Sequence, residues 1–151
     1  MKVFNSIDEI LDFAISAEQR AVDLYTSLVE KARVDDMKKV FMEFAKEEMG
    51  HKARLSKIKK EGIFTLPAEK VTDMKIADYS GEIKASEVQD YQQALVFAMS
   101  QEKAAFKLYS ALAERAPTTD LKRLFLSLAQ EEAKHKLRFE LEYDEYVLRE
   151  N

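Results

Sequence analysis

The chain has 151 residues, of which 46% are hydrophobic, so its length and composition suit one folded domain with a core and exclude a disordered chain. Acidic and basic residues are interspersed, the net charge is -4, and no basic block of the kind that binds nucleic acid occurs. The lack of cysteine excludes disulfides, thiolate metal sites, iron–sulfur clusters and cysteine nucleophiles.

Two long helices are predicted in the first part of the chain. Glycine and proline are scarce, with 3 and 2 copies, which favours long helices over a fold with many turns. The first helix is predicted from about Ile7 to Ala32, and Ser6 with Glu9 forms a capping box at its start. The second helix is predicted from about Asp36 to Glu61.

The second predicted helix is bounded by cap residues and followed by a connector. Asp35 is its predicted N-cap, and Gly62 is the predicted stop. Residues 62–85 carry Pro67 and Gly81 and show no long helical period. We interpret this stretch as a connector with room for one short helix.

The second part of the chain is also predicted to hold two long helices. The third helix is predicted to start after Ser86, with Gln89 completing a second capping box. Pro117, Thr118 and Thr119 then interrupt the helical pattern. The fourth helix is predicted from there to near the C-terminus.

An internal repeat relates the two halves, about 7–61 and 87–145, at a constant offset of 84 residues. Chance resemblance between helices would not keep this register through a loop, so we interpret the halves as duplicated helical hairpins. The connector can return the length of a 26-residue helix, about 39 Å. The predicted fold is an all-α four-helix bundle in a single domain over 1–151, with two hairpins joined by a long crossover. Gap-free matches include Leu24-Tyr25 with Leu108-Tyr109, Glu47-Glu48 with Glu131-Glu132, and His51-Lys52 with His135-Lys136.

The core-facing seam of each predicted helix has a polar interruption near its middle. At the 3-4 spacing of a buried helix face, the other seam positions are almost all apolar or aromatic. The first and third helices carry one glutamate there, and the second and fourth carry Glu-x-x-His, which places both side chains on one face. The polar seam residues are Glu18, Glu48, His51, Glu102, Glu132 and His135.

These six residues predict a site for two metal ions. A bare carboxylate in a core must be paired, coordinated or protonated, and four at one level would repel one another. Two divalent cations would neutralise four carboxylates, and two imidazoles would complete their ligand shells. Oxygen and imidazole ligands suit iron, with manganese as an alternative. The competing interpretations are surface Glu–His contacts, which would turn the apolar seams toward water, and a metal-free structural bundle.

Two pairs of neighbouring residues are predicted to lie around this site. Glu47 and Glu131 fall off the apolar seams, so we interpret them as rim or surface residues. Tyr25 and Tyr109 lie on the seams, two turns from Glu18 and Glu102. They are interpreted either as core packing residues or as catalytic support through a hydrogen bond to a ligand carboxylate.

The motifs resemble those of the ferritin-like di-iron carboxylate superfamily, and the small size and internal symmetry are most similar to the rubrerythrin di-iron domain. The resemblance covers nearly the whole chain and implies a ferritin-like four-helix bundle that holds two iron ions. It implies terminal glutamate ligands at 18 and 102, bridging glutamates at 48 and 132, and one metal for each histidine.

The chain departs from the rubrerythrin pattern in two respects. Rubrerythrins usually carry a rubredoxin-like iron domain with four cysteines, and this chain has none. They also have an additional glutamate three residues after the third-helix ligand, where this chain has Ala105, with Ala21 as its repeat mate. The resemblance therefore leaves open the redox-linked ligand exchange associated with that glutamate.

The resemblance implies an oxidoreductase that reduces peroxide or oxidises ferrous iron at the di-iron centre. The alternatives are an oxygen-dependent hydroxylase, which needs a substrate cavity at the metals, and a ferritin-type iron-binding or storage protein, which needs a hollow multi-subunit shell. We expect a separate electron-donor protein, because no cysteine-ligated second iron site is encoded, and a homodimer is an option. With no membrane-spanning run and no secretory signal, we expect a cytoplasmic protein without nucleic-acid or membrane partners.

Overall fold

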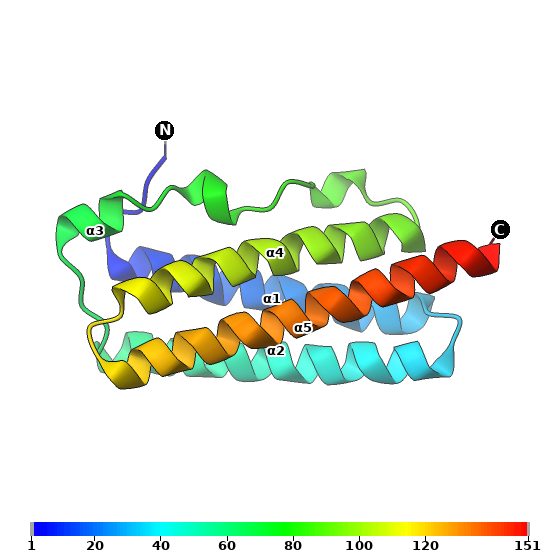
Figure 1. The fold of residues 1–151 in the computed structure, drawn as a ribbon, viewed down its shortest axis with the longest axis horizontal. Coiled ribbons are helices and arrows are strands. Elements are labelled where there is room, and N and C mark those ends of the chain that lie inside the picture. The colour runs from blue at the N-terminus through cyan, green and yellow to red at the C-terminus, as the bar shows by residue number, and fades with distance from the viewer. Residues whose placement is uncertain (1, 151) are drawn as a thin grey trace.

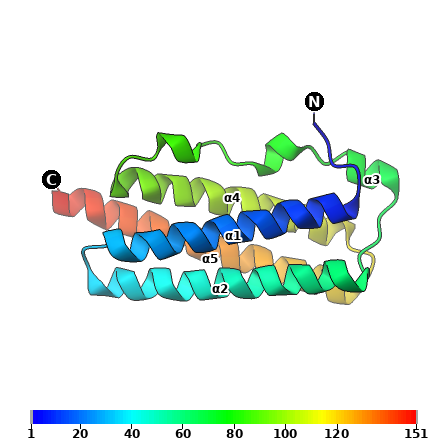
Figure 2. The ribbon, with the colours of Figure 1, turned by 180° about the vertical axis from the view of Figure 1, so that it is seen from behind.

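The computed structural model describes residues 2–150, in which four long helices lie side by side (Figure 1). Helices α1 (Ile7–Lys31) and α2 (Asp35–Glu61) form one antiparallel hairpin, which faces the viewer in Figure 2. Helices α4 (Tyr91–Arg115) and α5 (Thr119–Glu150) form the other. The prediction of an all-α bundle of two hairpins is confirmed.

The connector runs the length of the bundle and links the two hairpins as predicted (Figure 1). It holds the short helix α3 (Ala68–Thr72) and two 3-10 turns, η1 (Ile76–Tyr79) and η2 (Ala85–Glu87). The N-terminal residues pair with it, since the Phe4 N–H donates to the Met74 carbonyl at 3.4 Å. Phe4 and Met74 are both buried, so this pairing covers one end of the bundle core.

The first hairpin begins and ends largely as the sequence predicts. The Glu9 N–H donates to Ser6 Oγ at 3.1 Å, as in a capping box. Gly62 ends α2 in the left-handed conformation, with φ of 62°, where a side chain would be strained. The predicted Asp35 N-cap is wrong by one residue, because Val34 holds the cap position and makes no side-chain cap bond. Asp35 is the first helical residue, where its charge interacts favourably with the helix dipole.

The predicted start of the third helix after Ser86 is wrong. Ser86 lies within η2, and α4 begins at Tyr91 with Asp90 as its N-cap. The Gln93 N–H donates to Asp90 Oδ1 at 2.8 Å, and the Gln93 side chain accepts from the Gln89 N–H at 2.7 Å. Asp90 and Gln93 therefore satisfy the backbone N–H groups of Gln93 and Gln89 at the start of α4.

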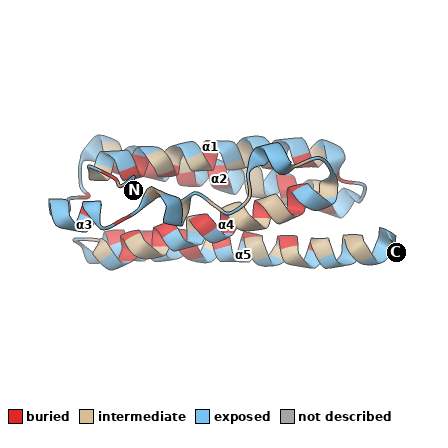
Figure 3. Ribbon diagram, turned by 90° about the horizontal axis from the view of Figure 1, so that it is seen from above, coloured by how far each residue is buried: buried red, intermediate tan, exposed pale blue. Residues whose placement is uncertain are grey.

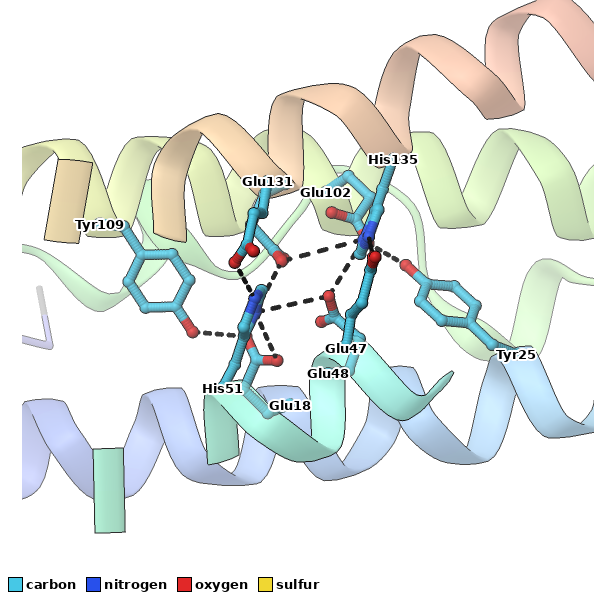
Figure 4. Close-up of polar contacts among 10 residues, drawn as sticks. Glu18, Tyr25, Glu47, Glu48, His51, Glu102, Tyr109, Glu131 and His135 are labelled. Atoms are coloured by element: carbon cyan, nitrogen blue, oxygen red, sulfur yellow. Dashed lines mark hydrogen bonds and ion pairs between the residues drawn. The ribbon is translucent and has the colours of Figure 1, made fainter. Parts of the chain in front are cut away.

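The buried residues lie on the inward faces of the helices (Figure 3). The hydrophobic ones form two clusters. One contains Tyr109 and Phe125, and the other contains Tyr25, Phe41 and Phe139. The polar seam residues lie between Tyr25 and Tyr109 along the bundle (Figure 4). Within residues 2–150, no helix combines the length and the apolar character that crossing a bilayer requires.

Candidate metal centre

The structure brings all six polar seam residues together in the middle of the bundle (Figure 4). Helices α1 and α4 contribute one glutamate each, and α2 and α5 contribute a glutamate and a histidine each. Every one of these side chains is buried, with no more than 2% of the residue exposed. The contributing residues are Glu18, Glu48, His51, Glu102, Glu132 and His135.

The six residues form two overlapping groups of potential ligands. In each group the donor atoms lie within 4.8 Å of one another. Glu48 and Glu132 belong to both groups, so each could contact two ions. The first group is completed by Glu18 and His51, and the second by Glu102 and His135. This sharing is the geometry expected of two adjacent metal ions with two bridging carboxylates.

Buried donor atoms without hydrogen-bond partners show that the site suits cations. Each of the six side chains has one such atom, and buried polar atoms are normally paired. The His51 Nδ1 lies 3.0 Å from Glu132 Oε1, and the His135 Nδ1 lies 3.1 Å from Glu48 Oε1. Four carboxylates and two imidazole nitrogens that face one another in this way fit the donor set that two divalent cations require. The unpaired atoms are Glu18 Oε2, Glu48 Oε1, His51 Nδ1, Glu102 Oε2, Glu132 Oε1 and His135 Nδ1.

Burial and mutual repulsion give the site a strong affinity for positive charge. Burial raises the pKa of Glu48 and Glu132, and the charge of Glu102 raises both further. Burial alone lowers the pKa of a histidine, but neighbouring carboxylates outweigh it and raise the pKa of His51 to about 9 and of His135 to about 11. Without metal, the site therefore takes up protons, and metal binding would release them.

Glu47 and Glu131 lie at the edge of the site and contact the histidines of the opposite hairpin. The side chains are 48% and 35% exposed, which agrees with a position at the rim. However, Glu131 Oε2 lies 2.5 Å from the His51 Nε2, and Glu47 makes the equivalent contact with His135. A metal on Nδ1 would leave the ring proton on Nε2, which then donates to the rim carboxylate and orients the ring. Their interpretation as rim or surface residues missed this contact.

Tyr25 and Tyr109 hydrogen-bond the glutamates of the opposite hairpin. The Tyr25 hydroxyl donates to Glu102 Oε1, and the Tyr109 hydroxyl donates to Glu18 Oε1. Burial, followed by the charge of these same glutamates, raises the pKa of both tyrosines well above the usual value, so both remain donors. Each tyrosine therefore fixes one carboxylate oxygen and leaves the other free for a cation.

Comparison with known proteins places this arrangement in a family. The family model described as Rubrerythrin matches residues 9–89 and 93–151. The chain belongs to the rubrerythrin family. It has the ferritin-like di-iron fold with a buried carboxylate and histidine cluster. No curated protein matches the sequence.

Two solved structures resemble this rubrerythrin-family chain over most of their length. A hypothetical protein from Pyrococcus furiosus is 28% identical, with a TM-score of 0.74 over 92% of this chain and 89% of that chain. A Thermotoga maritima protein, provisionally named a ferritin-like diiron-carboxylate protein, is 21% identical, with a TM-score of 0.76 over 97% and 99%. The second likeness concerns the fold alone.

This family member has Ala105 at the place where the rubrerythrin pattern has an additional glutamate. Ala105 is half-buried against the apolar cluster that contains Tyr109, and its repeat mate Ala21 packs in the same way against the other cluster. A methyl group cannot bind a cation. The chain therefore supplies four carboxylates to the centre, and these come from Glu18, Glu48, Glu102 and Glu132.

Proposed function

We propose that this chain is an oxidoreductase that reduces hydrogen peroxide at two iron ions held by the six buried residues. The observation that carries the proposal is the closed donor set, in which every side chain is at most 2% exposed and offers one buried atom without a hydrogen bond. Such a site admits a small oxidant more readily than an organic substrate. The rubrerythrin family membership supports iron as the metal and peroxide as the oxidant.

The six residues would bind the metals as bridging and terminal ligands. Glu48 and Glu132 would bridge the two ions, since both belong to the two ligand groups. Glu18 and Glu102 would be terminal ligands, each held in place by a tyrosine hydroxyl from the other hairpin. Each histidine would bind one ion through Nδ1 while its Nε2 keeps a proton directed at a rim carboxylate.

Iron ions held by these residues would supply the two electrons that convert hydrogen peroxide to two molecules of water. The reaction also consumes two protons. His51 and its partner Glu131 form a polar contact between the buried centre and a side chain that is 35% exposed. Because Nδ1 would be on a metal ion, the imidazole has no free nitrogen that could pass a proton inward, so this contact and the equivalent one between His135 and Glu47 would orient the rings, and the two protons would come from solvent.

The surface grooves give less support to the hydroxylase alternative. A groove of about 490 Å³ lies between α4 and α5, but none of the six metal-site residues lines it. An organic substrate in this groove would be separated from the donor atoms by the helices themselves. The lining residues are Lys103, Phe106, Lys107, Ala133, Lys136 and Glu140.

Stopped-flow oxidation of the anaerobic, ferrous-loaded protein tests the proposal. Separate mixing with hydrogen peroxide and with oxygen gives the two rates of ferric formation, followed by absorbance. The proposal predicts a faster reaction with peroxide. A faster reaction with oxygen would instead indicate a ferrous-iron oxidase or a hydroxylase.

A further inference from the structure

A continuous series of aromatic rings leads from the metal centre toward one end of the bundle. Tyr25, whose hydroxyl donates to Glu102, packs against Phe139 with ring centroids 5.2 Å apart. Phe139 lies 6.0 Å from Phe41, Phe41 lies 6.3 Å from Tyr91, and Tyr91 lies 5.0 Å from Tyr146. All four separations are in the range of direct ring contact. Tyr146 is half-buried, so the series ends at the surface.

A buried acid, Glu142, lies beside the outer rings of this series and is not one of the six metal-site residues. Glu142 is 2% exposed, and its Oε2 accepts a hydrogen bond from the Tyr91 hydroxyl at 2.7 Å. Its Oε1 is buried and has no hydrogen-bond partner, although burying a carboxylate is costly. Arg149 donates to Oε2 at 3.3 Å and also lies 5.9 Å from the centre of the Tyr146 ring. Tyr91 therefore has a proton acceptor in place at its hydroxyl.

The duplicated half of the molecule lacks this series, although it keeps the tyrosine at the metal centre. From Tyr109 the ring contacts lead to Phe125 at 6.2 Å and then to Phe64 at 5.4 Å, and Phe64 is buried. Three of the corresponding positions in the first hairpin hold aliphatic residues, and the fourth is the glycine that ends α2. The repeat mates of Phe139, Tyr91, Glu142 and Tyr146 are Leu55, Ile7, Ile58 and Gly62.

We propose that the aromatic series from Tyr25 to Tyr146 conducts single electrons to the metal centre, with Tyr91 as the residue that is oxidised and Glu142 as its proton acceptor. This inference rests on the proposed peroxide-reducing function. Burial and the hydrogen bond to Glu142 also raise the pKa of Tyr91 well above 10, so its hydroxyl is protonated before oxidation. A phenol that loses an electron becomes strongly acidic, which is why a carboxylate at the hydroxyl assists the step.

The series would act when peroxide meets a centre that holds only one reducing electron. Reduction of peroxide to two waters takes two electrons and two protons, and a centre with one ferrous and one ferric ion supplies one electron. Tyr91 supplies the second through the intervening rings, and its phenolic proton moves to Glu142 Oε2. The products are a centre with both ions ferric, a neutral tyrosyl radical at Tyr91, a protonated Glu142, and two water molecules whose two added protons come from solvent. A one-electron reductant at the surface then reduces the radical through Tyr146, and Glu142 returns the proton.

Electron paramagnetic resonance of the iron-loaded protein tests this proposal. The centre is first reduced to one electron per two iron ions, mixed with hydrogen peroxide without a donor, and frozen. A tyrosyl radical should form, and ring-deuterated tyrosine should narrow its spectrum. Tyr91→Phe should abolish this signal, and Glu142→Gln, which keeps a hydrogen-bond acceptor but not a base, should slow its formation about tenfold or more. With ascorbate as the reductant, the radical should decay more slowly in Tyr146→Phe.

A matched pair of variants separates electron transfer from packing. Phe41 and Phe125 are repeat mates and are both 0% exposed, but only Phe41 belongs to the series. Phe41→Leu should abolish the radical, whereas Phe125→Leu should retain it. Equal radical yields in these two variants, or a full signal in Tyr91→Phe, would overturn the inference. Ferric absorbance in the same samples distinguishes the two proposals. Ferric formation without a radical overturns the inference alone, and no reaction with peroxide overturns the proposed function and the inference with it.

Discussion

In the metal-free protein, the free energy of unfolding should fall as the pH rises from about 5 to about 8. In the metal-free folded state, burial and the charge of Glu102 raise the pKa of Glu48 from 4.5 to about 8. Over this window the folded state keeps a proton that the unfolded chain has released, so the free energy of unfolding falls with rising pH. One such proton changes stability by about 1.4 kcal/mol per pH unit, which lowers the Tm by roughly 3–6 °C per pH unit for a domain of this size.

The histidines contribute with the same sign. Their pKa values are also raised, so the stability that they provide is present below about 6.5 and is lost as the pH rises through about 9 for His51 and about 11 for His135. Bound cations would keep the carboxylates ionised and remove this proton linkage. The difference in Tm between metal-loaded and metal-free protein should therefore widen as the pH rises.

Thermal unfolding followed by circular dichroism measures this effect. Chelator-treated and iron-loaded protein are melted at intervals across the window, beside Glu48→Gln and Glu47→Gln. Glu48→Gln cannot take up the proton, so its metal-free Tm should depend less steeply on pH. Glu47→Gln, at a half-exposed rim position, should keep the steeper dependence. A metal-free Tm that rises across the window, or equal slopes in the two variants, would refute this account of the buried carboxylates.

The remaining predictions concern metal binding, helix capping and oxidant preference. Glu48→Ala should lose much more iron than Glu47→Ala, because Glu48 is in both ligand groups and Glu47 only contacts His135. Elemental analysis measures the iron content of both variants, and equal losses would make Glu47 a ligand. Asp90→Ala should lower the free energy of unfolding in urea by about 1 kcal/mol, because Asp90 caps α4, whereas Ser86→Ala should hardly change it. The reverse order would contradict the observed helix start. Ala105→Glu should raise the ratio of the peroxide rate to the oxygen rate in stopped flow, and an unchanged ratio would show that this position does not set the preference.

The long helices and the facing of the six buried donors could be predicted because both follow from local periodicity. One helical face of each segment is apolar, and a glutamate or Glu-x-x-His interrupts it at the same place in each repeat. Because the two halves match at a constant offset of 84 residues, the same buried positions could be predicted in both hairpins. Helix ends were less predictable, because Ser86 and Asp90 both begin a sequence that suits a capping box, and in the structure Ser86 lies in the exposed turn η2 while Asp90 caps α4.

The contacts between hairpins could not be predicted from spacing within one helix. Glu131 lies four residues before His135 in the chain, yet it contacts His51 of the other hairpin. Tyr25 likewise hydrogen-bonds Glu102 rather than Glu18, which lies on its own helix. Such pairings depend on the rotation and separation of two helices that are far apart in the sequence. The repetition of Glu47 as Glu131 was the one signal that these acids have a role at the site.

The central claim is that two metal ions share Glu48 and Glu132, and anomalous scattering from crystals of the iron-loaded protein tests it most directly. Data collected on both sides of the iron absorption edge locate iron independently of any other atom. The account predicts two peaks per chain, about 3.5–4 Å apart, each in contact with both shared glutamates and with one of the two histidines. A single peak within the bundle, or iron bound only at the exposed rim carboxylates, would contradict it.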